Sequence, residues 1–429
     1  MNNLKPSGIE WIGSIPVDWK TVPIYYVAEE VTTKNKTLLR KNAFKFFFGN
    51  IINKPNFNPD EDNYVNKTIR NYIIVNPGDI VINGLNLNFD FVTKRVGMVT
   101  RPGTITSAYI SLRPKANVIL PKYMLYILRT YDSEKAFHNM GGGVRKILNY
   151  DELSKSKIIL PSISAQTRII KFLDKKVSQI DDISKKIQQE ITDLEEYRNS
   201  IIVKAVTKGL NPNVLMKDSG IPWIGKIPQQ WNIEPIYLHF YQGKNKNNLG
   251  KEKNLLSLSY GKIIRKNINS VGGLLPSSYN TYNIVEAGDI IIRPTDLQND
   301  KRSLRTGLVT EHGIITSAYL DLKPKTKNSS RYYHYLLHAY DIQKVFYNMG
   351  NGVRQGLNFS EFSKLKILVP NLKNQLAISD YLDNLNKKIS KIILNKKSQL
   401  EKLNQYKQSI IYEYVTGKKQ VPTEEGAKE

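Results

Sequence analysis

The chain has 429 residues, 40 % hydrophobic and 10 % aromatic, which is enough for two or three globular domains. Its 63 Lys and Arg side chains against 38 Asp and Glu give a formal net charge of +25, which predicts nucleic acid as a partner. A basic surface from a biased composition is the simpler alternative. The absence of cysteine excludes disulfides and thiolate metal sites. No apolar run approaches the roughly 18 residues of a membrane span, so we expect a cytoplasmic protein.

The first segment of the chain occurs twice. Lys5–Trp19 reads KPSGIEWIGSIPVDW, and Lys217–Trp231 reads KDSGIPWIGKIPQQW. A shift of about 210 residues also aligns ITSAY with ITSAY, NMGGGVR with NMGNGVR, and YRNSII with YKQSII. Two copies of one domain-sized unit therefore make up the chain, because a solenoid repeats every ~20–50 residues. Pro and Gly in each opening segment predict a turn, anchored by its buried tryptophans: Trp11, Trp19, Trp223 and Trp231.

Short strand-like runs follow in each copy. NLLSLSY at 254–260 alternates apolar and polar residues with the period of a strand, and GDIVI and GDIII follow Gly-Asp turns. After them, YMLYILRTYDSEKAFHNM and YYHYLLHAYDIQKVFYNM predict a helix that ends at Gly141 and at Gly350. Together these elements predict a mixed α+β globule.

Two pairs of segments keep their length between the copies but change their chemistry. Segments 83–96 and 293–306 lie between the matched strands, and segments 41–52 and 253–264 precede them. The flanking segments match between the copies, while the residues between them differ in chemistry. This pattern predicts that each copy reads a different base sequence, with Arg and Lys suited to guanine and Asn and Gln to adenine. Neutral drift of solvent loops would also produce this divergence.

The glycine-rich segments GGGVRK and GNGVRQ do not fit a dinucleotide site, because they lack the third glycine of the fingerprint and follow a helix. Such a turn could bring an arginine close to a DNA backbone. A helix end followed by a surface arginine is the alternative. The candidate DNA-contacting residues are Asn50, Asn83, Asn86, Asn88, Lys94, Arg95, Arg145, Lys146, Ser257, Ser259, Lys262, Arg293, Thr295, Gln298, Lys301, Arg302, Arg305, Arg354 and Gln355.

After Pro161 and Pro370, apolar residues recur every three or four positions, which predicts two long amphipathic helices with coiled-coil spacing. We expect the two helices to pack against each other and to be related by an approximate two-fold. Their apolar stripes are Leu173, Val177, Ile180, Ile183, Ile187, Ile191, Leu194, Tyr197, Ile201 and Ala205, and Leu382, Ile389, Ile392, Leu400, Leu403, Tyr406, Ile410 and Tyr414. The predicted organisation is a recognition domain at 1–160, a helix at 161–210, a second domain at 211–370, a second helix at 371–418 and a flexible tail at 419–429.

No catalytic motif emerges. The chain has neither a Walker A segment nor the Asn-Pro-Pro-aromatic segment of amino-methyltransferases, and none of its five histidines is matched by a histidine in the other copy. His334 and His338 have metal-binding spacing but lack an apparent third ligand. Asp321-Leu322-Lys323 is similar to part of a nuclease motif, but the first copy has Ser111-Leu112-Arg113. We expect no catalytic residues and no metal site.

These duplicated motifs resemble those of the specificity subunit of type I restriction-modification systems. The resemblance rests on SGIxWIGxIPxxW, ITSAY, GxGVR and the helix ends SIIxxxVT, and it covers the chain except its tail. The family usually has Glu-Gln where this chain has Ala165-Gln166 and Asn374-Gln375.

The resemblance implies an α+β fold with two similar mixed α/β target-recognition domains, separated by two long antiparallel coiled-coil-like helices. It implies a non-catalytic DNA-recognition subunit that reads a split double-stranded DNA target and docks two methyltransferase subunits, with restriction and translocase subunits in the full complex. It also implies that S-adenosylmethionine, ATP and Mg²⁺ belong to those partners. A self-contained restriction or methyltransferase enzyme and a non-specific coiled-coil scaffold are the alternatives.

Overall fold

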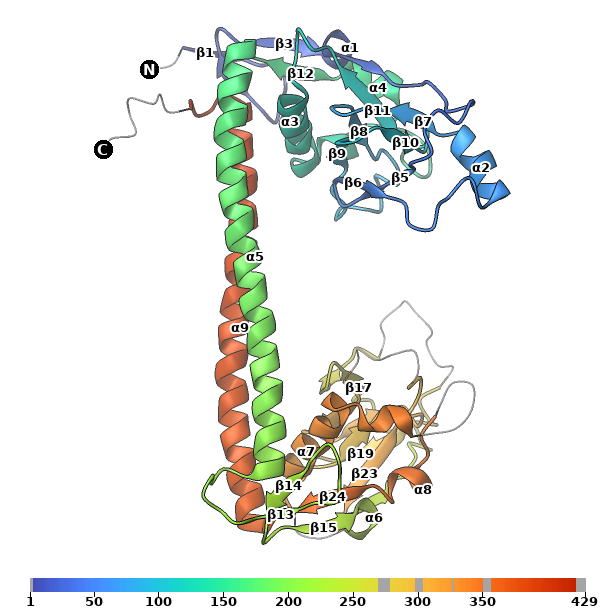
Figure 1. The fold of residues 1–429 in the computed structure, drawn as a ribbon, viewed down its shortest axis with the longest axis vertical. Coiled ribbons are helices and arrows are strands. Elements are labelled where there is room, and N and C mark those ends of the chain that lie inside the picture. The colour runs from blue at the N-terminus through green and yellow to red at the C-terminus, as the bar shows by residue number, and fades with distance from the viewer. Residues whose placement is uncertain (1–2, 269–277, 298–303, 326–327, 350–355, 422–429) are drawn as a thin grey trace, which may run out of the picture. The chain divides into compact units, whose positions relative to one another are not determined.

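The computed structural model describes residues 3–268, 278–297, 304–325, 328–349 and 356–421. The chain forms two compact units. Unit 1 comprises Met1–Ile187 and Ser398–Glu429, and unit 2 comprises Gln188–Lys397. Each unit contains the globular part of one copy of the repeat and a segment of each long helix, α5 (Ile163–Lys208) and α9 (Leu372–Val415) (Figure 1).

Apart from helix α2, which has no counterpart among the described residues of unit 2, the elements of the two units follow the same order along the chain. Unit 1 contains β1 (Leu4–Pro6), β2 (Ser14–Pro16), β3 (Lys20–Pro23), α1 (Ile24–Val27), β4 (Ala28–Glu30), β5 (Phe44–Phe47), β6 (Asn50–Asn53), α2 (Asn63–Arg70), β7 (Ile73–Val75), β8 (Ile80–Ile82), β9 (Val96–Met98), β10 (Gly103–Ile105), β11 (Ile110–Pro114), α3 (Pro121–Ser133), η1 (Ala136–Asn139), α4 (Tyr150–Lys155) and β12 (Lys157–Leu160). Unit 2 contains β13 (Met216–Asp218), β14 (Lys226–Pro228), β15 (Asn232–Pro235), α6 (Ile236–His239), β16 (Phe240–Gln242), β17 (Leu256–Ser259), β18 (Lys262–Arg265), β19 (Asn283–Val285), β20 (Ile290–Ile292), β21 (Thr306–Leu308), β22 (Gly313–Ile315), β23 (Leu320–Pro324), α7 (Ser330–Ile342), η2 (Val345–Asn348), α8 (Phe359–Phe362) and β24 (Lys366–Val369).

A four-stranded antiparallel sheet lies at the centre of each unit. Its strand order is β4-β11-β8-β9 in unit 1 and β16-β23-β20-β21 in unit 2. The strands β8 and β20 are central, and all three residues of each are buried, which explains why GDIVI and GDIII are apolar without alternation. The predicted strands and the mixed α/β class are confirmed.

The predicted helix in the middle of each copy is shorter than expected. Helix α3 ends at Ser133 and α7 at Ile342, and a short 3₁₀ turn follows in each unit. Between helix and turn, Lys135 and Lys344 both adopt left-handed backbone with φ +58°. A left-handed residue cannot continue an α-helix, so the prediction of a helix reaching Gly141 and Gly350 is wrong.

Of the four tryptophans predicted to be buried in the opening segments, two are buried and two, Trp11 and Trp223, are only partly buried. Trp19 and Trp231 are buried, at 7 % and 2 % exposure. Trp11 is partly buried and meets the ring of Tyr131 edge-on at 4.7 Å between centroids; the corresponding pair in unit 2, Trp223 and Tyr340, is also 4.7 Å apart. An edge-on aromatic pair of this kind contributes stability beyond that gained from the burial of its apolar surface.

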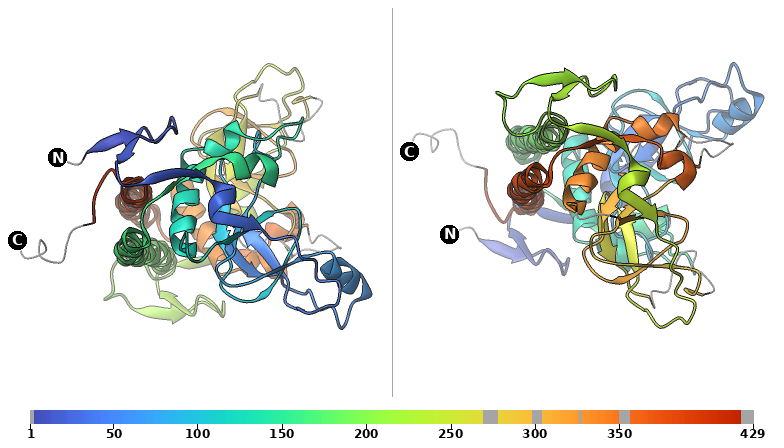
Figure 2. Two further views of the ribbon diagram at one scale, coloured as in Figure 1. Left: turned by 90° about the horizontal axis from the view of Figure 1, so that it is seen from above. Right: turned by 90° about the horizontal axis from the view of Figure 1, so that it is seen from below.

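The segments of α5 and α9 run in opposite directions within each unit. In unit 1 the rings of Phe172 and Tyr414 lie 4.4 Å apart, and Lys407 Nζ lies 2.6 Å from Asp181 Oδ1. In unit 2 Lys396 pairs with Glu190 at 2.5 Å. Figure 2 views both helices end-on.

The predicted apolar stripes are buried only in part. Leu173, Ile180, Leu382 and Ile389 are buried. The stripe residues Ile183, Tyr197, Ile392 and Tyr406 instead remain 43–58 % exposed. Contact between two helices covers only a narrow strip of each helix. Apolar residues that recur every three or four positions predict a wider apolar face, and the pattern does not show which part of that face the partner helix covers.

A glutamine fixes the start of each long helix to its unit. Gln166 Oε1 accepts the N–H of Leu120 at 2.7 Å, and Gln375 Oε1 accepts that of Ser329 at 3.0 Å. The predicted domain boundaries at 160/161 and 370/371 fall just before α5 and α9, whereas the two compact units divide within these helices. No described helix is long and apolar enough to cross a membrane.

Candidate nucleic-acid interface

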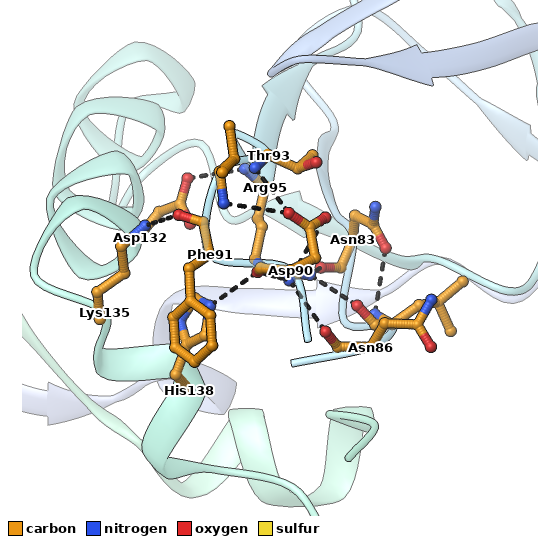
Figure 3. A network of polar contacts seen from close by, with 11 residues as sticks. Asn83, Asn86, Asp90, Phe91, Thr93, Arg95, Asp132, Lys135 and His138 are labelled. Carbon is orange, nitrogen blue, oxygen red and sulfur yellow. Dashed lines mark hydrogen bonds and ion pairs between the residues drawn. The ribbon is translucent and has the colours of Figure 1, made fainter. Parts of the chain in front are cut away.

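The loop between β8 and β9, residues 83–95, is organised by the arginine at its end. Arg95 is fully buried. Its guanidinium donates hydrogen bonds to the backbone carbonyls of Asn83 at 2.9 Å, Leu85 at 2.8 Å and Asp90 at 2.5 Å (Figure 3). One side chain therefore connects the start of the loop, at Asn83 and Leu85, with its second half, at Asp90.

The segment from α3 to η1 supports the same loop. Asp132 Oδ2 accepts the backbone N–H of Arg95 at 2.7 Å, and Lys135 donates to the carbonyl of Phe91 at 2.7 Å. The His138 ring stacks on Phe91 with centroids 4.7 Å apart (Figure 3). Burial lowers the pKa of the Arg95 guanidinium and raises the pKa of Asp132, and the two opposite charges each counteract this effect on the other.

Unit 2 repeats this arrangement. Arg305 is fully buried and donates to the carbonyls of Thr295 at 2.6 Å and Asp296 at 3.0 Å. Asp341 Oδ2 accepts the N–H of Arg305 at 2.5 Å. The guanidinium carbon lies 5.0 Å from the ring centroid of Tyr347, in the place of His138. The loop support is thus common to both units, although the loop sequences differ.

The prediction that Arg95 and Arg305 contact bases is wrong for this structure. Both guanidiniums lie in the interior and bond to the protein's own carbonyls, so neither is presented to a groove. The sequence contained a signal that could have shown this. These arginines occupy the same position in both copies, whereas residues that read two different base sequences are expected to differ.

The surface of the unit 1 loop brings several predicted residues together. Asn86 and Asn88 are exposed, while Leu87 between them is buried and holds the loop down. Asn88 Nδ2 donates to the carbonyl of Val144 at 2.9 Å, which attaches the glycine-rich turn and its exposed Arg145 to this loop. Asn86, Asn88 and Arg145 therefore belong to one surface.

Two other candidates are partly engaged inside the protein. Asn83 is half-buried, and its side-chain oxygen accepts the N–H of Leu85 at 3.1 Å. Lys146 is also half-buried and donates to the carbonyl of His138 at 2.8 Å. In this conformation both shape the loop.

The β5–β6 hairpin lies against the same end of β9. A Cβ on Gly97 would meet the carbonyl oxygen of Gly49 at 3.0 Å, so a glycine is needed for this close approach. The hairpin turn is formed by Phe48 and Gly49, with φ of +46° and +78°. Asn50 follows the turn and is exposed, as is Lys94 beside it.

The hairpin β17–β18 of unit 2 has the same turn. Tyr260 and Gly261 have φ of +45° and +77°, and Tyr260 is 82 % exposed. In the hairpin, Lys262 is exposed and pairs in register with the half-buried Ser259. Ser257 lies on the same strand, β17, as Ser259.

The remaining candidates lie in the second long loop and its neighbours. Thr295 is exposed and Arg293 is half-buried. Gln298, Lys301, Arg302, Arg354 and Gln355 lie outside the described residues.

The residues that resembled catalytic motifs have structural partners. Lys323 pairs with buried Asp289 and lies 3.7 Å from buried Asp321, while Arg113 and Asp79 form the corresponding pair in unit 1. Burial, followed by repulsion from Asp289, raises the pKa of Asp321 to about 7. Within the described ranges, no group of three or more His, Cys, Asp or Glu could hold a metal ion.

The chain thus has two mixed α/β units that share one frame, carry loops of equal length and different sequence, and pack on segments of two long helices. The chain belongs to the family of the type I restriction modification DNA specificity domain, whose sequence model matches residues 16–193 and 307–402. It is therefore a type I specificity subunit with a role in DNA recognition.

The chain is similar to a curated protein in sequence and to solved structures in fold. The chain is 24 % identical over 434 aligned residues to the putative type I restriction enzyme MjaX specificity subunit of Methanocaldococcus jannaschii, covering 96 % of each chain. It also resembles a chain from a solved structure described as the structural basis of complex assembly and conformational transition of the type I R-M system. That match has a TM-score of 0.68 and 12 % identity, and covers 94 % of this chain and 99 % of the other. The HsdS subunit from Thermoanaerobacter tengcongensis matches with a TM-score of 0.47 and 12 % identity, over 94 % and 98 % of the two chains.

Proposed function

We propose that each unit reads one part of a split DNA sequence. The observation that carries this proposal is the pair of β8–β9 and β20–β21 loops. A buried arginine holds each loop to the same frame, while the sequence between the strands differs. Exposed amide side chains such as Asn86 and Asn88 suit adenine edges. Two loops with different surfaces then specify two different half-sites.

The long helices dock the modification subunits in this proposal. Support comes from large apolar side chains on α5 and α9 that remain exposed: Ile183, Tyr197, Ile392, Leu394 and Tyr406. Because the chain contains two similar copies, it offers two similar surfaces, which suits two identical methyltransferase subunits.

The chemistry belongs to the partners. The chain itself acts without catalysis and supplies the DNA address. The methyltransferase subunits bring S-adenosylmethionine and flip the target adenine out of the duplex, and restriction and translocase subunits bring ATP and Mg²⁺. In this proposal the protein acts on cellular DNA in the cytoplasm.

Single-molecule methylation sequencing tests the proposal. DNA is compared from cells that express the chain with its cognate methyltransferase and from cells that lack only the chain. We expect adenine methylation at a split motif that depends on the chain. If no motif depends on it, a scaffold role fits better. If the purified chain alone methylates or cleaves DNA, the self-contained enzyme is correct.

A further inference from the structure

A polar cavity of about 540 Å³ lies within unit 1, beside the tip of the β5–β6 hairpin. Its walls come from the hairpin turn, the end of the β8–β9 loop, α3 and the unit 1 segments of α5 and α9. Phe48 and Asn50 lie at the hairpin side, and Lys94, Arg129 and Lys407 contribute positive charge.

The three cations differ in how they are held. The Arg129 guanidinium donates to the carbonyls of Gly49 at 3.1 Å and Val96 at 3.3 Å, and Lys407 pairs with Asp181 at 2.6 Å. For Lys94 the described residues provide no hydrogen bond and no ion pair. Partial burial, and then repulsion from Lys407 and Arg129, lowers the pKa of Lys94, while Asp181 and Asp132 counteract part of this effect. Repulsion among these cations would be relieved by an anion.

Unit 2 has a cavity of about 320 Å³ at the equivalent place. Tyr260 stands where unit 1 has Phe48, His338 replaces Arg129, and Arg198 replaces Lys407.

The lysine near the hairpin has changed position between the two cavities. Unit 1 has Asn50 on the hairpin and Lys94 at the loop end, whereas unit 2 has Lys262 on the hairpin and Leu304 at the loop end. Each cavity thus has a lysine on the hairpin or loop and at least one basic residue on a long helix: Lys407 in unit 1, and Arg198 and Lys387 in unit 2. Drift of a solvent-exposed loop would not preserve this pairing of charges.

The aromatic residue at each rim carries a backbone cost. Phe48 and Tyr260 are 50 % and 82 % exposed, and both have positive φ, which is unfavourable for a bulky residue. Such strain is concentrated at functional positions. An exposed aromatic ring can pack against a sugar or the face of a base.

We propose that each cavity binds a phosphodiester group of the DNA backbone, with the rim aromatic packing against the adjacent nucleotide. This inference rests on the proposed function and adds the site at which each unit grips the backbone beside its half-site. Lys94 binds the phosphate in unit 1, with Arg129 and Lys407 supplying the surrounding positive field. Lys262 and Arg198 take these roles in unit 2.

The test exchanges the lysine arrangement of one copy for that of the other. Lys94→Leu gives unit 1 the loop-end residue of unit 2, and Lys94→Leu combined with Asn50→Lys moves the lysine to the hairpin position that it occupies in unit 2. Lys155→Leu, on the exposed end of α4 and away from the cavity lining, removes the same charge as a control. Affinity of the full chain, assembled with its modification subunits, is measured from 50 to 300 mM salt on duplexes with and without the methylated motif.

Loss of one phosphate contact reduces the slope of log K against log salt by roughly 0.9, which corresponds to binding about eightfold weaker at 0.1 M salt. We expect this loss for Lys94→Leu on both duplexes, because phosphate contacts carry no base information. The double variant should recover the affinity and the slope, and Lys155→Leu should match the wild type.

Three outcomes would overturn the inference: an unchanged slope for Lys94→Leu, an equal loss for Lys155→Leu, or no recovery in the double variant. If Lys94→Leu weakens the binding of inorganic phosphate but leaves the affinity for DNA unchanged, the proposal that the cavity binds DNA phosphate is also overturned. If the wild-type assembly itself does not discriminate the two duplexes, it is the proposed function that fails.

Discussion

Arg95→Met separates a structural arginine from one that reads a base. The substitution keeps most of the side-chain length but removes the guanidinium that binds three loop carbonyls at 2.5–2.9 Å. A hydrogen bond from a charged donor contributes about 1.5–3 kcal/mol, and the three are not additive because water can reach the released carbonyls. We therefore expect the free energy of unfolding of unit 1 to fall by about 3–5 kcal/mol.

Urea unfolding of the full chain, combined with amide hydrogen exchange, measures this effect. Exchange should accelerate across residues 83–95, and recognition of the half-site assigned to unit 1 should weaken at several base positions together. Arg305→Met should have the same effect on the other half-site. The reasoning is refuted if Arg95→Met leaves stability within about 0.5 kcal/mol of the wild type and relaxes preference at a single base, as a direct contact would.

Three further substitutions test other parts of the structure. Gly97→Ala places a methyl group 3.0 Å from the Gly49 carbonyl oxygen, so the hairpin must shift and the free energy of unfolding should fall by about 1–3 kcal/mol in urea titrations; an unchanged midpoint would contradict this packing. Tyr123→Phe removes the hydroxyl that donates to the Val415 carbonyl at 3.1 Å, and should cost about 1 kcal/mol and speed amide exchange in the last turn of α9, whereas unaltered exchange would argue against this bond. Asp321→Ser removes a carboxyl whose pKa of about 7 in the folded protein lies above its value in the unfolded chain, so the wild type loses stability as pH rises through 7. The difference in Tm between variant and wild type should therefore shift in favour of the variant between pH 5 and 8. A difference in Tm that stays constant over this range would contradict the raised pKa.

The duplicated frame could be predicted from the sequence because buried strands and helix faces repeat in both copies. GDIVI and GDIII became equivalent central strands, and the tryptophans became anchors, since apolar burial follows directly from residue type. The end of α3 could not be predicted, because the left-handed backbone of Lys135 has no residue signature.

The candidate site was predicted at the level of segments and less well for single residues. The sequence shows that an arginine stands at a given position, but it does not show whether the guanidinium faces a DNA groove or the backbone carbonyls of the protein. Arg95 therefore appeared among the base-reading candidates, and the structure shows it inside the loop. The residues that hold it, such as Asp132, were missed because their contact spans 37 positions of the chain. Arg129 and Lys407 were missed for the same reason, since only the fold brings them to one cavity.

Exchange of one loop tests the central claim most directly, namely that each unit reads its own part of a split target. Residues 293–306 are replaced by the sequence of residues 83–96, and the methylated motif is determined by sequencing alongside that of the wild type. The account predicts that one part of the motif changes while the other part and the spacing between them stay the same. An unchanged motif from a folded and assembled protein, or a change in both parts, would contradict it.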